Sequence, residues 1–220
     1  TDGGDLPLEP KRAIAHNVTI APALHANAPV AAAAKDGKSE NFRRVAVLSV
    51  DSDEVAQAVT FRLARQAAEE GKLPLFLEVR PDMHDPQAVP GFAELLDGSA
   101  SFAGVIYRDP ASRAHVIEAG QRAIDDELTM NGRFDLVLEA IDHTYDQVFF
   151  DLGLIDDSLI SAQILSLADK VVVATGGSPA GPELEAALNM LEEHTGAPVK
   201  VESAGTKAAP GGGRSSDMAA

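Results

Sequence analysis

Acidic residues crowd the junction between a predicted strand and a predicted helix near residue 50. Three of the four residues at 51–54 are acidic, and they separate the apolar run 44–50 from the helical pattern 55–70. Proteins that bind phosphate at such a junction use glycines, whose backbone N–H groups wrap the anion, and a lysine. From Ser49 to Glu70 there is neither glycine nor lysine. This junction is therefore predicted to repel phosphate groups rather than to bind them.

Other reactive side chains are absent or scattered. The chain has no cysteine, which excludes disulfides, zinc–thiolate sites and thiol catalysis. The histidines show neither ligand spacing nor a recognisable catalytic pair, so no metal site is predicted. They are His16, His25, His84, His115, His143 and His194.

Two glycine-containing segments elsewhere invite comparison with a phosphate loop. Gly37-Lys38-Ser39 precedes a strand instead of following one, and Ala32 stands where the leading glycine would be, so we do not interpret it as a phosphate loop. The segment 176–178, Gly-Gly-Ser, follows a strand at the edge of the sheet where open α/β proteins bind ligands. A ligand loop and a turn into the next helix are both open there, and the turn is favoured.

Charge and hydropathy narrow the class of protein. Asp and Glu number 34 against 18 Lys and Arg, and the net charge of −16 disfavours binding to nucleic acid or to an anionic membrane. No apolar run approaches the ~20 residues of a membrane span, and the start of the chain lacks a signal-peptide pattern. With 45% hydrophobic residues in 220, the chain can bury one core. We expect one soluble domain and no nucleic-acid partner.

Changes in composition mark the ends of that domain. Residues 1–41 contain four prolines and an alanine run without apolar periodicity, and they are predicted to be a flexible linker. Residues 205–220 are rich in glycine, serine and alanine and are predicted to be a disordered tail. The folded domain is predicted at 42–204. Because the chain starts at Thr1 instead of methionine, it fits a processed or excised part of a longer polypeptide.

Short apolar runs alternate with helical patterns through the folded part, which is typical of βαβ units. The predicted fold class is α/β, with a mostly parallel sheet and helices on both faces, because the strands are apolar throughout. The predicted strands are 44–50, 75–79, 115–117, 147–151, 171–175 and 199–201.

Apolar residues at helical spacing indicate the helices. In the helix 55–70 a residue recurs every four positions and predicts one buried stripe, formed by Val55, Val59, Leu63 and Ala67. Two further stripes predict a helix before the central strand and a last helix. Their residues are Phe134, Val137, Leu138 and Ile141 in the first, and Leu184, Leu188 and Leu191 in the second.

Three segments carry recognisable motifs in a characteristic order. They read GFAELLDG at 91–98 followed by 102–109, RF at 133–134 leading to YDQVFFD at 145–151, and ADKVVV at 168–173. Together they resemble the cytoplasmic domain of bacterial tyrosine kinases that work with polysaccharide co-polymerases in capsule and exopolysaccharide export. These kinases are relatives of the septum-positioning and partition ATPases with deviant phosphate loops. The resemblance covers most of 42–204 and implies a P-loop NTPase-like fold.

Under this resemblance the phosphate loop is degenerate. Val55, Ala56 and Gln57 occupy the positions of the family's glycine, lysine and serine or threonine, and Asp53 belongs to the same loop. The flexible backbone, the cation that neutralises the phosphates and the hydroxyl that binds Mg²⁺ are all lost. We predict that these four positions bind no cofactor.

The resemblance also places two acidic motifs. Glu78 matches the first acid of the family's DxD motif for Mg²⁺ and water positioning, and Arg80 replaces the second. Asp151 keeps the strand-end acid of a third motif. Glu78 and Asp151 are therefore implied to be vestigial, and no catalytic residue is predicted. The tail tyrosines that the family phosphorylates are missing, because the chain contains only Tyr107 and Tyr145.

The resemblance implies a pseudo-ATPase at the cytoplasmic face of the inner membrane that regulates or scaffolds exopolysaccharide polymerisation and export. Its implied partners are a membrane polysaccharide co-polymerase region, upstream on the same polypeptide or separate, the export machinery, and further copies of the chain. No cofactor is expected. Two alternatives are open: an active tyrosine autokinase or ATPase that binds ATP and Mg²⁺ at a non-standard site, and a partition or pilus-positioning ATPase relative.

Overall fold

The computed structural model of the chain describes residues 42–82, 85–177 and 181–205. The predicted linker 1–41, which includes Gly37-Lys38-Ser39, lies outside the described residues. So does the predicted tail beyond Gly205. The domain boundaries therefore stay predictions.

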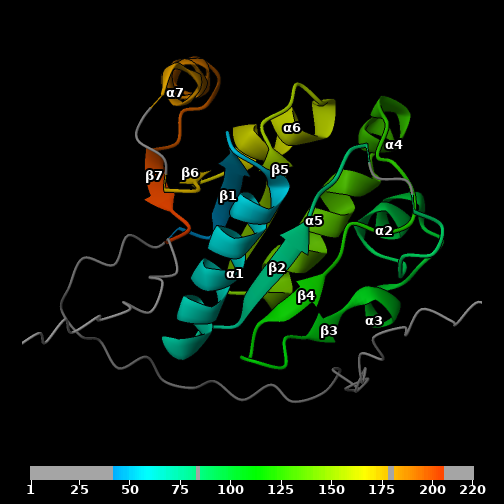
Figure 1. The fold of residues 1–220 in the computed structure, drawn as a ribbon. Helices are drawn as coiled ribbons and strands as arrows, with labels where there is room; N and C mark the ends of the chain where they lie inside the picture. Colours follow the sequence, from blue (N-terminus) through cyan, green and yellow to red (C-terminus); the bar gives the residue numbers. More distant parts are fainter. Residues whose placement is uncertain (1–41, 83–84, 178–180, 206–220) are drawn as a thin grey trace, which may run out of the picture.

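Seven strands form one sheet (Figure 1). Their order across the sheet is β3-β4-β2-β5-β1-β6-β7, and all neighbours are parallel except β3 and β4. The strands are β1 (Arg44–Ser49), β2 (Pro74–Glu78), β3 (Tyr107–Arg108), β4 (His115–Ile117), β5 (Gln147–Leu154), β6 (Lys170–Thr175) and β7 (Val199–Ser203). The predicted α/β fold with a mostly parallel sheet is confirmed.

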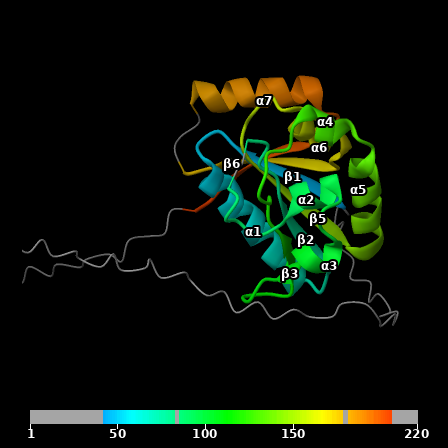
Figure 2. The same ribbon diagram turned by 90° about the vertical axis from the view of Figure 1, so that its right-hand side faces the viewer.

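Helices cover both faces of this sheet. They are α1 (Asp53–Glu69), α2 (Phe92–Asp97), α3 (Phe102–Val105), α4 (Asp126–Met130), α5 (Arg133–Thr144), α6 (Leu159–Leu167) and α7 (Pro182–His194). Figure 2 shows α1 on one side of the sheet and α5 on the other. The core cluster on the α1 side joins Val59, Ala64 and Ala67 to the strands, while the larger cluster on the other side includes residues of α2, α4, α5, α6 and α7.

Helix α1 starts and packs differently from the prediction. It begins two residues early, at Asp53, because the Ser52 side chain caps its N-terminus. The predicted stripe is only half correct: Val59 and Ala67 are buried, whereas Val55 and Leu63 are partly exposed. The buried face also includes Ala56, Thr60, Ala64 and Ala68. Small side chains allow the helix backbone to approach the sheet closely, and a search for large apolar residues does not detect such a face.

Two strand predictions also need correction. The strand predicted at 147–151 continues to Leu154, which pairs with Ser49 after a register shift in β1. The prediction ended too early because Gly153, with a φ of 70°, interrupts the apolar pattern. Strand β3 was not predicted at all, since its two residues are too few to show a period. The four to six residues of α2, α3 and α4 are too few for the same reason.

The other helical predictions are confirmed. All four residues of the α5 stripe are buried. In α7, Leu184 and Leu191 are buried, and Leu188 packs partly buried against the core. Among the described residues, no helix is both long enough and apolar enough to cross a membrane.

Parallel pairing brings the carboxyl ends of four strands together at one edge of the sheet. Ser49, the last residue of β1, lies beside Leu154 of β5 and Ala174 of β6. Glu78, the last residue of β2, lies beside Asp151 of β5. The acidic turn 51–54 therefore leaves β1 between the ends of its neighbours, and this edge is the candidate site.

Candidate functional site

The turn after β1 is folded onto its own hydroxyl groups. Ser49 Oγ accepts hydrogen bonds from the backbone N–H groups of Asp51 at 3.0 Å and Ser52 at 3.4 Å. Ser52 Oγ accepts one from the N–H of Val55 at 3.4 Å, which caps α1. These N–H groups therefore donate to side chains of the turn itself.

Two carboxylates of the turn reach across to the neighbouring strand ends. Asp51 Oδ2 accepts a hydrogen bond from the N–H of Gly176, just after β6, at 2.6 Å. Asp53 Oδ1 accepts one from the N–H of Leu154, at the end of β5, also at 2.6 Å. Backbone donors at this edge of a parallel sheet are the groups that α/β proteins commonly offer to anionic ligands. Here the protein's own anions occupy them.

Gly153 allows Asp53 to come this close. Its φ of 70° lies in the left-handed region that favours glycine. A Cβ atom at this position would lie 2.3 Å from Asp53 Oδ1 and 3.1 Å from the Arg80 guanidinium carbon. Any larger residue would therefore force both side chains to move.

Arg80 supplies a positive charge inside the site. Its Nη2 lies 2.7 Å from Asp151 Oδ2 and 3.4 Å from Glu78 Oε1. Its Nη1 donates to the backbone carbonyl oxygens of Val79 at 2.8 Å and Asp151 at 2.9 Å. The side chain of Arg80 is only 10% exposed and that of Asp151 is fully buried. The guanidinium thus lies between Glu78 and Asp151, the two acids predicted to be vestigial.

The carboxylate of Glu78 is held by donors of the protein itself. Its Oε1 accepts a hydrogen bond from Gln57 Nε2 at 3.2 Å, besides the ion pair with Arg80. Its Oε2 accepts from the backbone N–H of Ala119 at 3.1 Å. Both oxygens therefore have partners within the protein.

Burial shifts the ionisation of Asp151. Loss of water around the carboxyl group raises its pKa to about 6, and the neighbouring Arg80 opposes this shift without cancelling it. The N–H of Gly153 also donates to Asp151 Oδ1 at 3.2 Å, which favours the charged form. Burial thus makes the charged form of Asp151 costly to keep.

The structure brings four of the predicted site residues together, buries Ala56 and places Val55 beside Gly176. Asp53, Gln57, Glu78 and Asp151 all lie around Arg80 or Gly153. Ala56 is fully buried against the sheet. Val55 is partly buried and packs against the core on the α1 side.

The sequence analysis missed the pairing of Arg80 with Asp151 and that of Asp51 with Gly176. Each joins residues far apart in the chain, 71 and 125 positions respectively. The only hint in the sequence is the glycine pair at 176–177, which follows a strand and interrupts the apolar pattern. Gly176 and Gly177 are described and follow β6, with a φ of 93° at Gly177. Ser178 lies outside the described residues.

The residues present do not fit a phosphate group with its metal ion. The backbone donors at Gly176 and Leu154 are already bonded to carboxylates. Arg80 lies between Glu78 and Asp151, where a divalent cation would need free carboxylate oxygens. Within the described ranges, no group of three histidine or acidic side chains is arranged to hold a metal ion.

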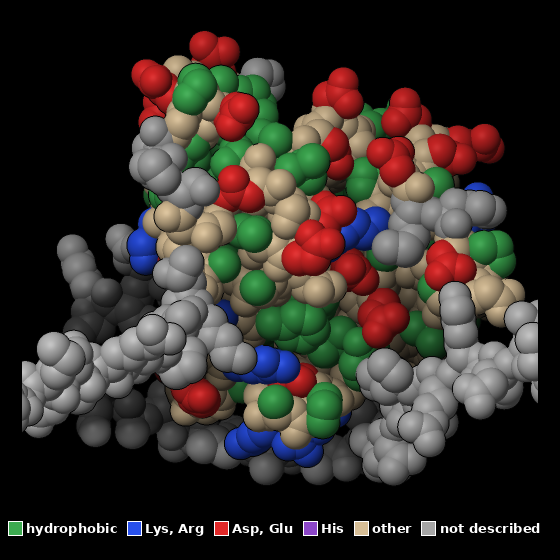
Figure 3. Space-filling model, viewed as in Figure 1, with side chains coloured by type: hydrophobic (Ala, Val, Ile, Leu, Met, Phe, Trp, Pro, Cys, Tyr) green, Lys and Arg blue, Asp and Glu red, His purple; other side chains and the backbone are tan. Residues whose placement is uncertain are grey.

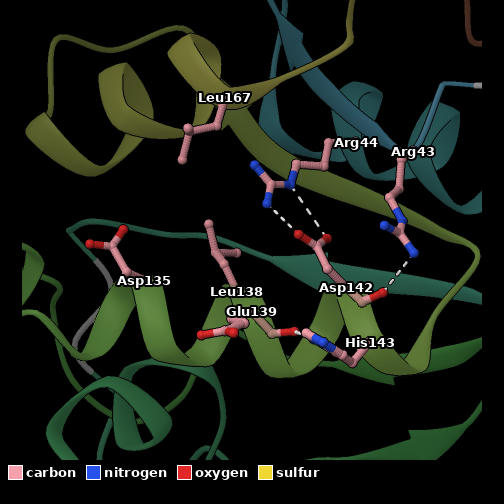
Figure 4. A pocket seen from close by; sticks show the side chains of 8 residues that line it. All are labelled: Arg43, Arg44, Asp135, Leu138, Glu139, Asp142, His143 and Leu167. Atoms are coloured by element: carbon pink, nitrogen blue, oxygen red, sulfur yellow. Dashed lines mark hydrogen bonds and ion pairs between the residues drawn. The ribbon is translucent and has the colours of Figure 1, made fainter.

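A pocket lies at the opposite edge, beside the start of β1 (Figure 4). Its volume is about 580 Å³, and its walls come from α5, the end of α6 and the first residues before and in β1. Arg44 forms an ion pair with Asp142 there, and Arg43 donates to the Asp142 carbonyl oxygen at 2.8 Å. Because β1 has six residues, this pocket is roughly 20 Å from the acidic turn.

Acidic side chains also gather on the outside of the candidate site. In Figure 3 they lie along the upper rim of the molecule, over α4, α6 and α7. The exposed acids in or next to these helices include Asp126, Glu127, Asp156, Asp157, Glu183 and Glu185. The carboxylates of the turn are thus surrounded by further negative charge.

No protein-family model and no curated protein matches the chain. Solved structures do. The kinase domain of VpsO superposes with a TM-score of 0.62 at 19% identity, over 74% of this chain and 85% of that domain. The kinase domain of the Escherichia coli tyrosine kinase Etk does so with a TM-score of 0.58 at 19% identity, over 80% and 74%.

A third similar structure is an ATP-binding enzyme of another activity. Cobyrinic acid a,c-diamide synthase from Mycobacterium smegmatis, solved with an ATP analogue and magnesium, matches with a TM-score of 0.55 at 19% identity, over 73% of this chain and 72% of that one. At this level of identity the likeness concerns the fold. The chain therefore has the P-loop ATPase fold, in the form seen in bacterial tyrosine kinase domains.

Proposed function

We propose that this chain is a catalytically degenerate relative of the bacterial tyrosine kinases, a pseudo-ATPase that regulates or scaffolds exopolysaccharide polymerisation and export. The fold shared with kinase domains and the three sequence motifs support the kinship. One observation supports the proposed loss of ATP binding. Carboxylates and an arginine of the protein itself occupy the places where phosphate and metal would bind.

The electrostatic argument follows from where these charges lie. A phosphate at the N-terminus of α1 would meet Asp51 and Asp53 within a few Å. Two like charges 4 Å apart repel by about 1 kcal/mol in water and about 4 kcal/mol at the effective dielectric of a protein surface. An incoming phosphate would also have to break the hydrogen bonds to Gly176 and Leu154. The repulsion and the loss of these hydrogen bonds both oppose phosphate binding.

Arg80 removes the need for a metal ion. Glu78 and Asp151 already share one guanidinium, which makes four contacts at 2.7–3.4 Å and offsets part of their negative charge. Mg²⁺ would have to displace this group from both acids. The site is thus stable without nucleotide, and the fold remains as a scaffold for partners.

The expected partners follow from the kinship. They are a membrane polysaccharide co-polymerase region and the export machinery, met at the cytoplasmic face of the inner membrane. In this role the chain would act through its surfaces, and further copies of the chain are also possible partners.

Isothermal titration calorimetry with Mg·ATP tests the proposal directly. No binding heat is expected for the chain as it exists. A matched variant combines Arg80→Asp with Asp53→Gly, and a melting curve verifies that it folds. Any heat it gains measures what the native residues prevent. Micromolar affinity of the native chain for Mg·ATP would overturn the proposal and favour an active kinase or ATPase with a non-standard site.

A further inference from the structure

We infer that β7 is an interaction edge through which two copies of this chain pair, strand against antiparallel strand. The inference concerns a different part of the molecule from the closed phosphate loop and does not depend on the proposed function. Among the strands of residues 42–82, 85–177 and 181–205, β7 is the last of the sheet and has a neighbour, β6, on one side only (Figure 1). The β3 edge at the other end has two residues and is antiparallel, whereas β7 has five.

Two hydrogen bonds show which backbone groups of β7 point outward. Val171 donates to the carbonyl of Pro198, and Ala204 donates to the carbonyl of Thr175. In a parallel ladder this register directs the N–H and C=O groups of Lys200 and Glu202 toward β6. Those of the alternate residues are therefore directed away from the sheet. These residues are Val199, Val201 and Ser203.

The outward groups have no partner among the described residues. No hydrogen bond from the described part of the chain reaches the outer side of β7. The Val201 side chain is also 41% exposed. Such a strand edge is a template for another strand unless something blocks it.

Charged residues often block edges of this kind, so the order of the charges on β7 decides whether a second strand can pair there. Lys200 and Glu202 flank Val201 symmetrically. In an antiparallel pair centred on Val201, Lys200 of each copy lies opposite Glu202 of the other. Opposite charges at directly facing positions stabilise a strand pair, while like charges would destabilise it. The pattern is therefore complementary to itself, as a two-fold interface requires.

The backbone groups fit the same register. Val201 would face Val201 of the second copy, and Val199 would face Ser203. All of these residues direct their N–H and C=O groups outward, so every facing pair of this kind can exchange both hydrogen bonds. A shift by one residue would bring inward-directed groups opposite outward-directed ones. Hydrogen bonding excludes a shift by one residue. Charge excludes a shift by two, which would place Lys200 opposite Lys200 or Glu202 opposite Glu202, so the two criteria together select one register.

Within one copy, the charged residues of β7 already have partners. Glu202 accepts from Arg62 of α1 at 2.7 Å and from Lys200 at 2.9 Å within one copy. Lys200 is 60% exposed, so it can turn from its own Glu202 to that of the second copy. The two seven-stranded sheets would then form one continuous sheet.

Sedimentation velocity of the native chain is the first test. We expect a dimer that forms in the micromolar range in about 0.15 M salt, where repulsion between the two acidic copies is screened. Val201→Pro removes an outward donor without removing a bond to β6, and it should weaken dimerisation at least tenfold with an unchanged melting temperature. Val201→Thr is the matched control and should still dimerise. A native chain that stays monomeric at roughly 100 µM overturns the inference.

A charge-exchange experiment tests the register. Lys200→Glu alone and Glu202→Lys alone place like charges opposite each other in a homodimer, so each should dimerise at least tenfold more weakly. Mixing the two variants restores opposite charges at both facing positions, and a heterodimer should form. Melting curves of each variant verify folding. Dimers that persist in both single variants would show that another surface holds the copies together. A mixture that stays monomeric would contradict the proposed pairing of Lys200 with Glu202.

Discussion

Two clusters of charge in this molecule have similar contacts and very different surroundings. The buried cluster, formed by Arg80, Glu78 and Asp151, closes the carboxyl edge of the sheet. The edge cluster, formed by Arg62, Lys200 and Glu202, lies on β7. The shortest ion pair measures 2.7 Å in both. In the buried cluster the arginine is 10% exposed, whereas in the edge cluster it is 44% exposed.

This difference in exposure separates two roles for the same chemistry. Removing one partner of a buried pair leaves a charge without water or counter-ion, whereas an exposed partner is replaced by solvent. The buried cluster is therefore committed to the fold, and it closes the site that would otherwise admit a ligand. In the edge cluster the two cations, Arg62 and Lys200, keep much of their contact with water, and Lys200 is the more available of the two to a second molecule.

The largest effect is expected from Arg80→Ala. It leaves Asp151 buried without its counter-charge, and the free energy of unfolding should fall by about 3–5 kcal/mol. Urea unfolding followed by circular dichroism at pH 7 measures it. Adding Asp151→Leu removes the isolated charge and should recover at least half of the loss. A cost below about 1 kcal/mol for the single variant would contradict the role assigned to the buried cluster.

Gly153→Ala should cause the second-largest loss of stability. The new Cβ meets Asp53 Oδ1, and the left-handed φ adds its own cost, so we expect a loss of about 2–4 kcal/mol in the free energy of unfolding. Gly132→Ala is the matched control, because Gly132 has a φ of 76° with open space around it and should cost only about 1 kcal/mol. Equal losses at the two glycines would mean that Asp53 does not pack as described.

The pH dependence of the free energy of unfolding should report the protonation of Asp151. Its folded-state pKa is about 6, above the ordinary 3.8, so between these values the folded protein holds a proton that the unfolded chain has released. The free energy of unfolding should therefore fall as pH rises from about 4 to about 6 and then level off, by at most about 3 kcal/mol. Chemical unfolding across this range measures the slope.

Asp151→Asn is the control for that slope. Other carboxylates, among them Asp109 and Glu202, have pKa values lowered by their ion pairs or hydrogen bonds and act in the opposite direction at lower pH. The difference between the native chain and the variant isolates Asp151. If both curves have the same shape from pH 4 to pH 7, Asp151 does not titrate in this range.

The smallest effect belongs to the edge cluster. Arg62→Ala removes an arginine that is 44% exposed, and the free energy of unfolding should change by less than about 1 kcal/mol. The same urea experiment serves for it and for Arg80→Ala. A loss as large as that of Arg80→Ala would remove the distinction between the two clusters.

Much of the fold and part of the site could be predicted from local sequence. Six strands, the stripes of α5 and α7, and the absence of glycine and lysine in the turn at 51–54 are all properties of short segments. The buried face of α1 was predicted only in part, because Ala56 and Ala64 pack through small size and not through hydrophobicity. β3 is too short to show any pattern.

The sequence by itself determined that the turn after β1 is acidic, that Arg80 replaces an acid, and that Lys200 and Glu202 flank an apolar residue. The tertiary structure alone decided what these charges meet. Only the parallel pairing of β2 with β5 places Arg80 against Asp151, and only the end position of β7 leaves its outer backbone groups without a strand from the described part of the chain. The physical reason is that the electrostatic energy of a charged group depends on the distance to neighbouring charges and on its contact with water. Both are set by contacts between residues far apart in the chain.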